Sequence, residues 1–252
     1  DVYRWVEGVE DFPYLIDTTS DVVMAKMEEY RDDFIWAPAR ALYDAPDKLA
    51  TKDEEVAEYL LDQASEKEHE IMVEAAYVIL GSEGVERARI NNERGIRQRL
   101  LTNSLLSNNH LTAHSGYMKY RKAILQTGAE LYELRANATL REHFRANKDE
   151  EEVPAGIHTK AFVIDGDQAL IGSFNFDPRS RDLNSEIGLV VTSEEFARQV
   201  TEQMEQDFAP ENSYRLFLDE RGTIVDLTLD APPCHAEPCP TYPSSERALA
   251  VL

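Results

Sequence analysis

The sequence predicts an α/β fold, because short apolar runs of strand length alternate along the chain with amphipathic segments of helical length. The chain has 252 residues, of which 42% are hydrophobic, so it can bury the core of one large domain or two small ones. A third observation is a pair of apolar runs, residues 161–164 and 169–171, that flank Asp-Gly-Asp, a hairpin turn signal.

The first third of the chain predicts two helices and a strand. Residues 21–34 mix polar and apolar side chains in a way compatible with one helix. Thr51-Lys52-Asp53-Glu54 fits a capping box that opens a second helix. The inner face of that helix would carry Val56, Tyr59, Leu60 and Ala64. The apolar run over residues 71–80 has the length of a central strand.

The middle of the chain continues the alternation. We expect a helix, a strand, a helix and a strand over residues 81–95, 100–102, 112–126 and 129–134. Gly128 directly follows the second of these helices and is a typical stop signal. Residues 136–153 are polar and charged, which predicts an exposed loop before the hairpin.

After the hairpin, Glu186 opens an apolar run of strand length, residues 187–191. Thr192-Ser193-Glu194-Glu195 resembles another capping box. The helix that follows places Phe196, Val200, Met204 and Phe208 at a spacing of four, on one face. Residues 214–218 and 223–229 flank Arg-Gly and predict a second hairpin, and the tail from residue 231 is rich in proline and predicted to be irregular.

The charge of the chain restricts its partners. Its formal net charge is −22, with 48 acidic and 26 basic residues, which argues against a general nucleic-acid binder. No apolar run approaches the length of about 20 residues that spans a bilayer. The chain begins at Asp1 without Met and without the charged-then-apolar start of a signal peptide, so we expect a segment of a longer protein.

Polar residues gather at one end of the first hairpin. Side chains alternate along a strand, so His158 and Lys160 lie on one face of the first strand, and Ser173 and Asn175 lie on one face of the second. A two-residue turn at residues 166–167 would place Lys160 opposite Ser173 and His158 opposite Asn175. A turn at residues 165–166 would shift the pairs by two residues and keep the same faces together, whereas a three-residue loop would break this register. An ammonium and a carboxamide can hold anionic oxygens, and a neutral imidazole beside them can attack phosphorus or transfer a proton.

The pattern His158-x-Lys160-x-x-x-x-Asp165, followed by Gly172-Ser173-x-Asn175, resembles the HKD motif of the phospholipase D superfamily. The continuation through residues 177–180 to Asn184-x-Glu186 looks like the second HKD half of bacterial cardiolipin synthases. Upstream, residues 101–104 and 114–122 are similar to the same half in the subgroup typified by the third bacterial cardiolipin synthase.

The resemblance covers roughly residues 52–230 and implies a phospholipase D-like half, with a mixed central sheet flanked by helices on both faces. It divides the chain into three parts. Residues 1–50 would form a linker and helical segment at the junction with a missing N-terminal half. Residues 51–230 would form the domain with one HKD motif, and residues 231–252 would form the proline-rich tail.

The resemblance also assigns the site. It gives catalytic roles to His158, Lys160, Asp165 and Glu186, and phosphate contacts to Lys160, Ser173, Asn175 and His114. In this assignment His158 attacks or protonates at phosphorus and Glu186 orients its imidazole. Asp165 mainly holds the turn, a place that its neighbour Gly166 would favour in any case. No metal or other cofactor is implied, since lysine supplies the positive charge.

The implied function is phosphatidyl transfer between phospholipids, with phosphatidylglycerol and phosphatidylethanolamine as substrates, at the cytoplasmic face of a bacterial inner membrane. The chemistry needs two histidines and this chain supplies one HKD motif, so a second half is expected in the same chain or in a second copy. One alternative is a homodimeric phosphodiesterase or nuclease, which the acidity disfavours. The other is a non-catalytic half that serves a partner. No specific nucleic acid is expected.

Two further groups are read as having no chemical role. Residues 102–104 follow a strand, where α/β sheets place ligand-binding loops, but a polar turn explains them as well. Cys234 and Cys239 with His235 between them supply three potential ligands, which do not make a four-ligand zinc site.

Overall fold

The computed structural model describes residues 24, 25, 28, 34–52, 54–66, 69–139 and 154–227. Its strands are β1 (Ala39–Tyr43), β2 (Glu70–Ala75), β3 (Arg97–Asn103), β4 (Glu130–Leu134), β5 (Lys160–Ile164), β6 (Gln168–Gly172), β7 (Ile187–Thr192), β8 (Ser213–Leu218) and β9 (Ile224–Leu227). Its main helices are α3 (Lys48–Thr51), α4 (Glu55–Glu66), α5 (Gly81–Glu93), α6 (Leu111–Gln126), α8 (Pro178–Asp182) and α9 (Glu194–Phe208).

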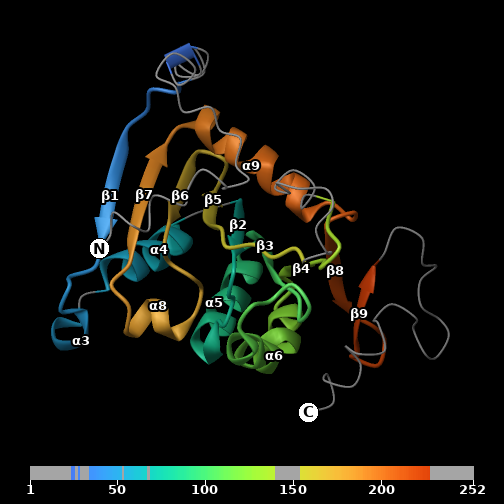
Figure 1. Ribbon diagram of the computed structural model, residues 1–252. Helices are drawn as coiled ribbons and strands as arrows, with labels where there is room; N and C mark the ends of the chain where they lie inside the picture. The colour runs from blue at the N-terminus through green and yellow to red at the C-terminus, as the bar shows by residue number, and fades with distance from the viewer. Residues whose placement is uncertain are drawn as a thin grey trace, which may run out of the picture.

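The strands form one nine-stranded sheet in the order β1-β7-β6-β5-β2-β3-β4-β8-β9 (Figure 1). β2 pairs in parallel with β3, and β3 pairs in parallel with β4. All other neighbours in the sheet are antiparallel. The sheet is therefore mixed, as expected, with the predicted hairpin β5–β6 near its centre.

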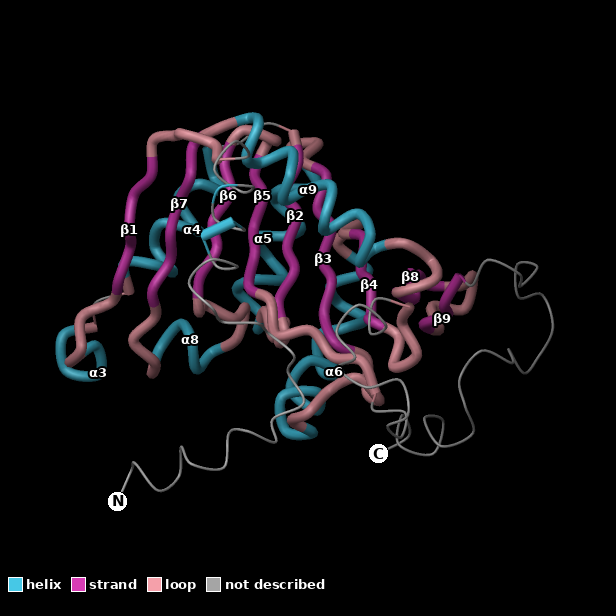
Figure 2. Tube along the Cα trace, turned by 45° about the horizontal axis from the view of Figure 1, so that its top comes forward, coloured by secondary structure: helices cyan, strands magenta, loops and turns pink. Residues whose placement is uncertain are grey.

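Helices cover both faces of the sheet. Successive strand residues point to opposite sides, so apolar side chains of one strand enter a core on each face. Ile71 and Val73 of β2 pack into a core cluster with side chains of α4 and α6. Met72, between them, packs into a second cluster with side chains of α9. Figure 2 shows α9 on the near side of the sheet and α4, α5 and α6 on the far side.

Three helices follow the sequence prediction. α5 ends before Gly95 and α6 ends before Gly128, and both glycines adopt the positive φ of helix stops, 84° and 90°. α9 begins after Ser193, whose side chain accepts a hydrogen bond from the Phe196 backbone N–H. The predicted face of α9 packs against the sheet, with Met204 and Phe208 buried.

The predicted capping box at Thr51 is wrong. Thr51 ends α3, Lys52 adopts a left-handed conformation with φ of 60°, and α4 begins at Glu55. A distant carboxylate replaces the local cap, because the Val56 backbone N–H donates to Asp44 Oδ1 at 3.1 Å. The strand predicted over residues 71–80 is also shorter than expected, since β2 ends at Ala75.

The hairpin has the three-residue loop that the sequence left open beside a two-residue turn. Ile164 pairs with Gln168, so the loop between β5 and β6 holds three residues. The register that placed Lys160 opposite Ser173 is lost with it. Gly166 reverses the chain with φ of 71°, a conformation open to glycine at little cost.

The segment expected as a linker contributes to the described sheet, because β1 pairs along its whole length with β7. Of the helix expected over residues 21–34, residues 24, 25 and 28 are helical and residue 34 is not; the rest lies outside the described residues. Residues 140–153 and the tail over residues 231–252 also lie outside them. No helix in the described part of the chain is both long and apolar enough to cross a membrane.

Candidate active site

His158 and Lys160 meet at the start of β5. The Lys160 Nζ lies 2.8 Å from His158 Nδ1 and donates to the His158 carbonyl oxygen at 2.7 Å. Lys160 is buried, whereas the His158 side chain is exposed. Burial lowers the pKa of Lys160, and the carboxylates of Glu186 and Asp177 act in the opposite direction. The hairpin therefore presents an imidazole and a partly desolvated ammonium side by side.

Backbone contacts fix the segment that carries His158. Asn103 bonds both backbone groups of Ile157, since its Oδ1 accepts from the N–H and its Nδ2 donates to the carbonyl, each at 2.9 Å. The Ala76 N–H donates to the Thr159 carbonyl at 3.2 Å. These bonds hold the residues on either side of His158 against the ends of β2 and β3.

Glu186 lies at the other side of the site, 6% exposed. The Ser173 hydroxyl donates to one of its carboxylate oxygens, and Asn184 Nδ2 donates to the other at 3.3 Å. In this geometry the hydrogen bonds of Glu186 go to Ser173 and Asn184, not to the imidazole of His158. Its carboxylate faces Lys160 electrostatically.

Asn175 and the short helix α8 close the site from the β6 side. The Asn175 backbone N–H donates to Ser180 Oγ at 3.1 Å, and its buried side-chain Oδ1 has no hydrogen-bond partner among the described residues. Asp177 caps α8 by accepting from the Ser180 N–H at 2.8 Å. Burial raises the pKa of Asp177, and the nearby Glu186 carboxylate adds to this. No chemical role was predicted for Asp177 from the sequence.

Asp165 lies at the opposite end of β5, about 16 Å from Lys160 at the usual rise per strand residue. Its Oδ1 accepts from the backbone N–H groups of His69, at 3.0 Å, and Glu70, at 2.9 Å. It adopts a positive φ of 51° in the hairpin loop. These contacts tie the loop to the start of β2, in agreement with the turn role that the sequence favoured.

A buried ion pair that the sequence did not indicate supports the site. Lys48 Nζ lies 2.6 Å from Asp44 Oδ2, and the two side chains are 1% and 0% exposed. The same Asp44 oxygen accepts from the Glu186 backbone N–H at 3.0 Å, and Lys48 also donates to the Ser180 carbonyl at 2.9 Å. The pair therefore joins α3, α8 and the start of β7.

His114, expected to contact phosphate, is buried in α6. It is 3% exposed inside α6, with its ring 5.7 Å from the Tyr117 ring. Burial lowers its pKa, which favours a neutral imidazole. Its described neighbours also include Glu133 and Arg121, on the helix side of the sheet. Thr102 and Asn103 do not form the expected polar turn: they are buried in β3, and both side chains donate to the Ala76 carbonyl.

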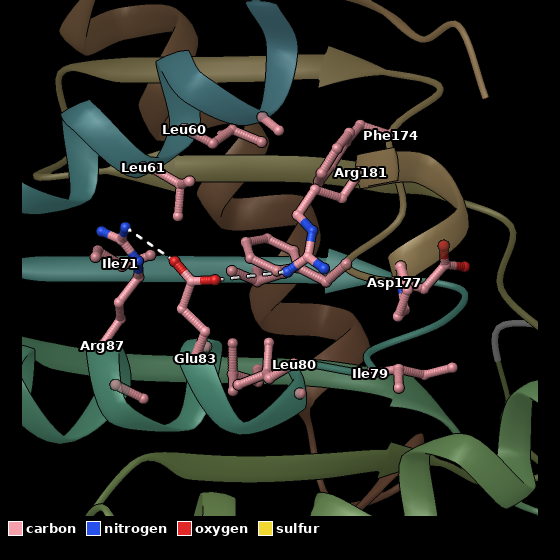
Figure 3. Close-up of a pocket in the computed structure, with 18 of the residues that line it drawn as sticks. Leu60, Leu61, Ile71, Ile79, Leu80, Glu83, Arg87, Phe174, Asp177 and Arg181 are labelled. Atoms are coloured by element: carbon pink, nitrogen blue, oxygen red, sulfur yellow. Dashed lines mark hydrogen bonds and ion pairs between the residues drawn. The ribbon is translucent and has the colours of Figure 1, made fainter. Parts of the chain in front are cut away.

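Two cavities border the site. One, of about 170 Å³, lies between α4, α5 and α8 and is lined mainly by apolar side chains, among them Leu60, Leu80 and Phe174 (Figure 3). Glu83 spans it by ion pairs to Arg87 at 3.3 Å and Arg181 at 3.9 Å. The other, of about 890 Å³, lies beside His158 under α9.

The chemistry open to the site is the capture of an anion. Lys160 supplies the positive charge, and the exposed His158 beside it supplies a ring nitrogen for attack or proton transfer. Within the described ranges, no group of three or more His, Cys, Asp or Glu side chains is placed to hold a metal. Cys234 and Cys239 lie outside those ranges.

Solved structures share this architecture. Nuc, a phospholipase D family member from Salmonella typhimurium, matches 71% of this chain and 99% of its own, with a TM-score of 0.50 and 17% identity. Phosphatidylserine synthase of Haemophilus influenzae Rd KW20 matches 79% of this chain and 47% of its own, with a TM-score of 0.52 and 14% identity. At such identities the likeness establishes the fold alone, which is phospholipase D-like.

Sequence comparisons establish the family. Residues 59–208 match the family model described as "Cardiolipin synthase, PLD-like domain". Cardiolipin synthase C of Escherichia coli K12 is 34% identical over 228 residues, which are 88% of this chain and 46% of that protein. Cardiolipin synthase A of Pseudomonas aeruginosa LESB58 is 24% identical over 202 residues, 74% of this chain and 37% of that protein. The chain belongs to the cardiolipin synthase family of phospholipase D-like domains, and it spans less than half the length of these relatives.

Proposed function

We propose that this chain is one half of a phosphatidyltransferase that makes cardiolipin by moving the phosphatidyl group of phosphatidylglycerol or phosphatidylethanolamine to a hydroxyl of phosphatidylglycerol. The observation that carries the proposal is the contact of 2.8 Å between Lys160 Nζ and His158 Nδ1 at the start of β5. The relationship to cardiolipin synthases supports the substrate class. We also propose that the chain is the second HKD half of a protein in the subgroup typified by the third bacterial cardiolipin synthase.

In the proposed mechanism His158 attacks the lipid phosphorus and displaces the alcohol of the first lipid. A phosphohistidine forms as the P–O bond to that alcohol breaks, and an acid protonates the leaving oxygen. The hydroxyl of the second lipid then attacks the phosphohistidine and frees the ring. Lys160 and Asn175 hold the phosphoryl oxygens during both steps.

The present contacts of His158 require one movement in this mechanism. An ammonium is only a donor, so Nδ1 accepts from Lys160 and a neutral ring then carries its proton on Nε2. Attack on phosphorus requires a lone pair on the attacking nitrogen. We therefore expect the ammonium to move from the ring to the phosphoryl oxygens as substrate binds. This frees Nδ1 to take the proton, and Nε2 then attacks.

A second phospholipase D-like half is part of the proposal, because the leaving alcohol needs an acid as well as a nucleophile. The chain spans 46% of cardiolipin synthase C, so a second half in the same protein fits the relatives. A second copy of this chain is the other arrangement. We place the activity at a membrane surface, where the lipid substrates reside. Residues 51–230 would form the working domain together with β1 and the Asp44–Lys48 pair that precede them, and Asp165 and Glu186 would act by holding the hairpin and the site.

The test is the capture of the phosphohistidine. The chain, together with its second half, is mixed with vesicles of labelled phosphatidylglycerol, with and without phosphatidylethanolamine, and quenched within one turnover. We expect label on the parent protein and on the control His69→Ala, whose exposed side chain lies outside the site. His158→Ala should carry no label and make no cardiolipin. Parental turnover by His158→Ala would refute the assignment.

The rival activity is tested in the same preparation. A homodimeric phosphodiesterase would cleave a nucleic acid or a simple diester and would make no cardiolipin. The net charge of −22 opposes binding to a polyanion. Cleavage of DNA at a rate above that of lipid transfer, lost in His158→Ala, would favour this rival. Turnover that survives in His158→Ala would point to a non-catalytic half.

A further inference from the structure

Two buried carboxyl groups face each other under α9. Glu74 lies in β2 with 2% of its surface exposed, and Asp207 lies in the last turn of α9 with 8% exposed. The two side chains are hydrogen-bonded to each other, and the Thr159 hydroxyl also bonds Glu74. These three residues line the cavity of about 890 Å³ together with His158. The apolar run in which Glu74 occurs gave no sign of this pair.

One proton is shared between these acids near neutral pH. The pKa of Glu74 is raised to about 8, first by burial and then by the charge of Asp207 and the hydrogen bond to it, against which the bond from Thr159 acts. Burial also raises the pKa of Asp207, while the bond from Glu74 lowers it. Glu74 is therefore the protonated member and donates to the Asp207 carboxylate, while Thr159 donates to Glu74.

Other ionisable groups on this face are engaged elsewhere. The ionisable groups on the α9 side of the sheet are Arg99, Glu205, Tyr132, Glu130 and, at the cavity edge, His158. Arg99 makes a two-fold ion pair with Glu205, and the Tyr132 hydroxyl donates to Glu130 at 3.0 Å. His158 bonds Lys160. No described cation pairs with Glu74 or Asp207, so ionisation of Glu74 would leave two buried negative charges in contact.

We propose that Glu74 is a positioning residue for His158, because its protonated carboxyl joins α9 through Asp207 to the strand segment that carries His158 through Thr159. Thr159 directly follows His158 and directly precedes Lys160. β2 also holds this segment by its backbone, since the Ala76 N–H donates to the Thr159 carbonyl and Glu74 pairs with Ala161. The exposed ring of His158 thus depends on its neighbours for its direction.

The proposal has a direct consequence for pH. As the pH rises through about 8, Glu74 loses its proton and the two carboxylates repel each other. The bond to Asp207 is lost, and the repulsion displaces the Glu74 carboxylate from α9, together with Thr159, which still donates to that carboxylate. The segment with His158 should then become less ordered. The loss of order around His158 does not depend on the lipid substrate. The effect of that loss on turnover rests on the proposed function.

Glu74→Gln is the decisive variant, because an amide is uncharged, similar in shape, and can donate to Asp207 while accepting from Thr159. The first readout is the ring resonance of His158 by NMR in the full chain, assigned with His158→Ala. In the parent we expect a second inflection near pH 8, which Glu74→Gln lacks. The infrared band of a protonated carboxyl should disappear over the same range in the parent and be absent from Glu74→Gln.

The second readout is turnover, measured for the chain with its second half. With a pKa near 8, about one molecule in ten keeps the proton at pH 9, so parental turnover should fall about tenfold between pH 7 and pH 9 through this group. Glu74→Gln should lose much less. Stability should also depend on pH. The pKa of Glu74 is about 8 in the folded chain and 4.5 in the unfolded chain, so the free energy of unfolding falls as the pH rises from about 4.5 to about 8. Glu74→Gln should lack that decline.

Thr159→Val separates positioning from packing. It keeps the shape of the side chain but removes the bond to Glu74, so it should lower turnover several-fold at pH 7 and remove the second inflection of the His158 resonance. Thr127→Val is the matched control, since the Thr127 hydroxyl bonds the Ile124 carbonyl at 2.7 Å in the last turn of α6. It should leave the His158 resonance as in the parent.

Two results would overturn the proposal. One is a His158 resonance whose titration is the same in the parent, Glu74→Gln and Thr159→Val. The other is a carboxyl band that persists in Glu74→Gln, because the shared proton would then lie elsewhere. A parent that shows the inflection and the band but makes no cardiolipin would refute the proposed function and leave the positioning role standing.

Discussion

Replacing Lys48 by Met removes one member of the buried pair beneath the site. Asp44 would stay in place, 0% exposed on its side chain, with the N–H groups of Val56 and Glu186 as its remaining donors. Breaking a buried pair from one side costs about 3–5 kcal/mol, because an uncompensated charge stays buried. For a domain of this size 1 kcal/mol shifts Tm by about 2–4 °C, so Lys48→Met should lower Tm by roughly 6–20 °C.

The assay is urea denaturation followed by tryptophan fluorescence and by circular dichroism, with Tm measured in parallel. Arg198→Met is the matched control, because Arg198 also pairs with a carboxylate four residues away, Glu202, but the two side chains are 57% and 60% exposed. An exposed pair of this kind contributes about 0.3–0.5 kcal/mol. The control should therefore shift Tm by no more than about 2 °C.

Lys48→Met should also lower turnover at a temperature where it is still folded. Lys48 holds the Ser180 carbonyl, and Asp44 holds the backbone of Glu186, so both sides of the site lose support. A free energy of unfolding within about 1 kcal/mol of the parent would refute the reasoning. It would mean that water or a local rearrangement stabilises the charge of the Asp44 carboxylate, and that the Lys48–Asp44 pair contributes little to the stability of the fold.

Three further outcomes are expected. Lys160→Ala should lower turnover about 10²–10³-fold, as loss of one charge-stabilising donor usually does, and near-parental single-turnover rates would contradict this. Asp165→Ala leaves the part-buried N–H of Glu70 without its acceptor, which should cost about 1–3 kcal/mol, whereas water can bond the exposed N–H of His69; the misaligned hairpin should also slow turnover. Asp165→Asn should cost less in the same denaturation assay. Excess chelator should leave lipid transfer unchanged, because Lys160 supplies the charge, and restoration by zinc or magnesium after a loss would count against the mechanism.

Local periodicity was enough to predict most of the elements. The four-residue spacing of apolar side chains predicted the buried face of α9, and Gly95 and Gly128 marked where α5 and α6 end. The apolar runs on either side of Asp-Gly-Asp predicted β5 and β6. These signals are local, because the apolar spacing that defines a helix face or a strand lies within one short stretch of sequence.

Turn length and helix start were decided elsewhere. Asp-Gly-Asp is compatible with loops of two or three residues, and Asp165 selects the longer one by bonding to the start of β2. The capping box at Thr51 is locally plausible, but Asp44 supplies the cap of α4 from outside the segment. Local capping energies of about 1 kcal/mol are easily outweighed by such tertiary contacts.

The sequence by itself determined the α/β class, the hairpin and the residues of the HKD motif, because each is encoded in short spacings. Only the tertiary structure decided what surrounds them. It joined Lys48 to Ser180, 132 residues away, turned Glu186 toward Ser173, buried His114, and set Glu74 against α9. The physical reason is that burial and pairing of charge depend on which distant segments pack together, and no local pattern records that choice.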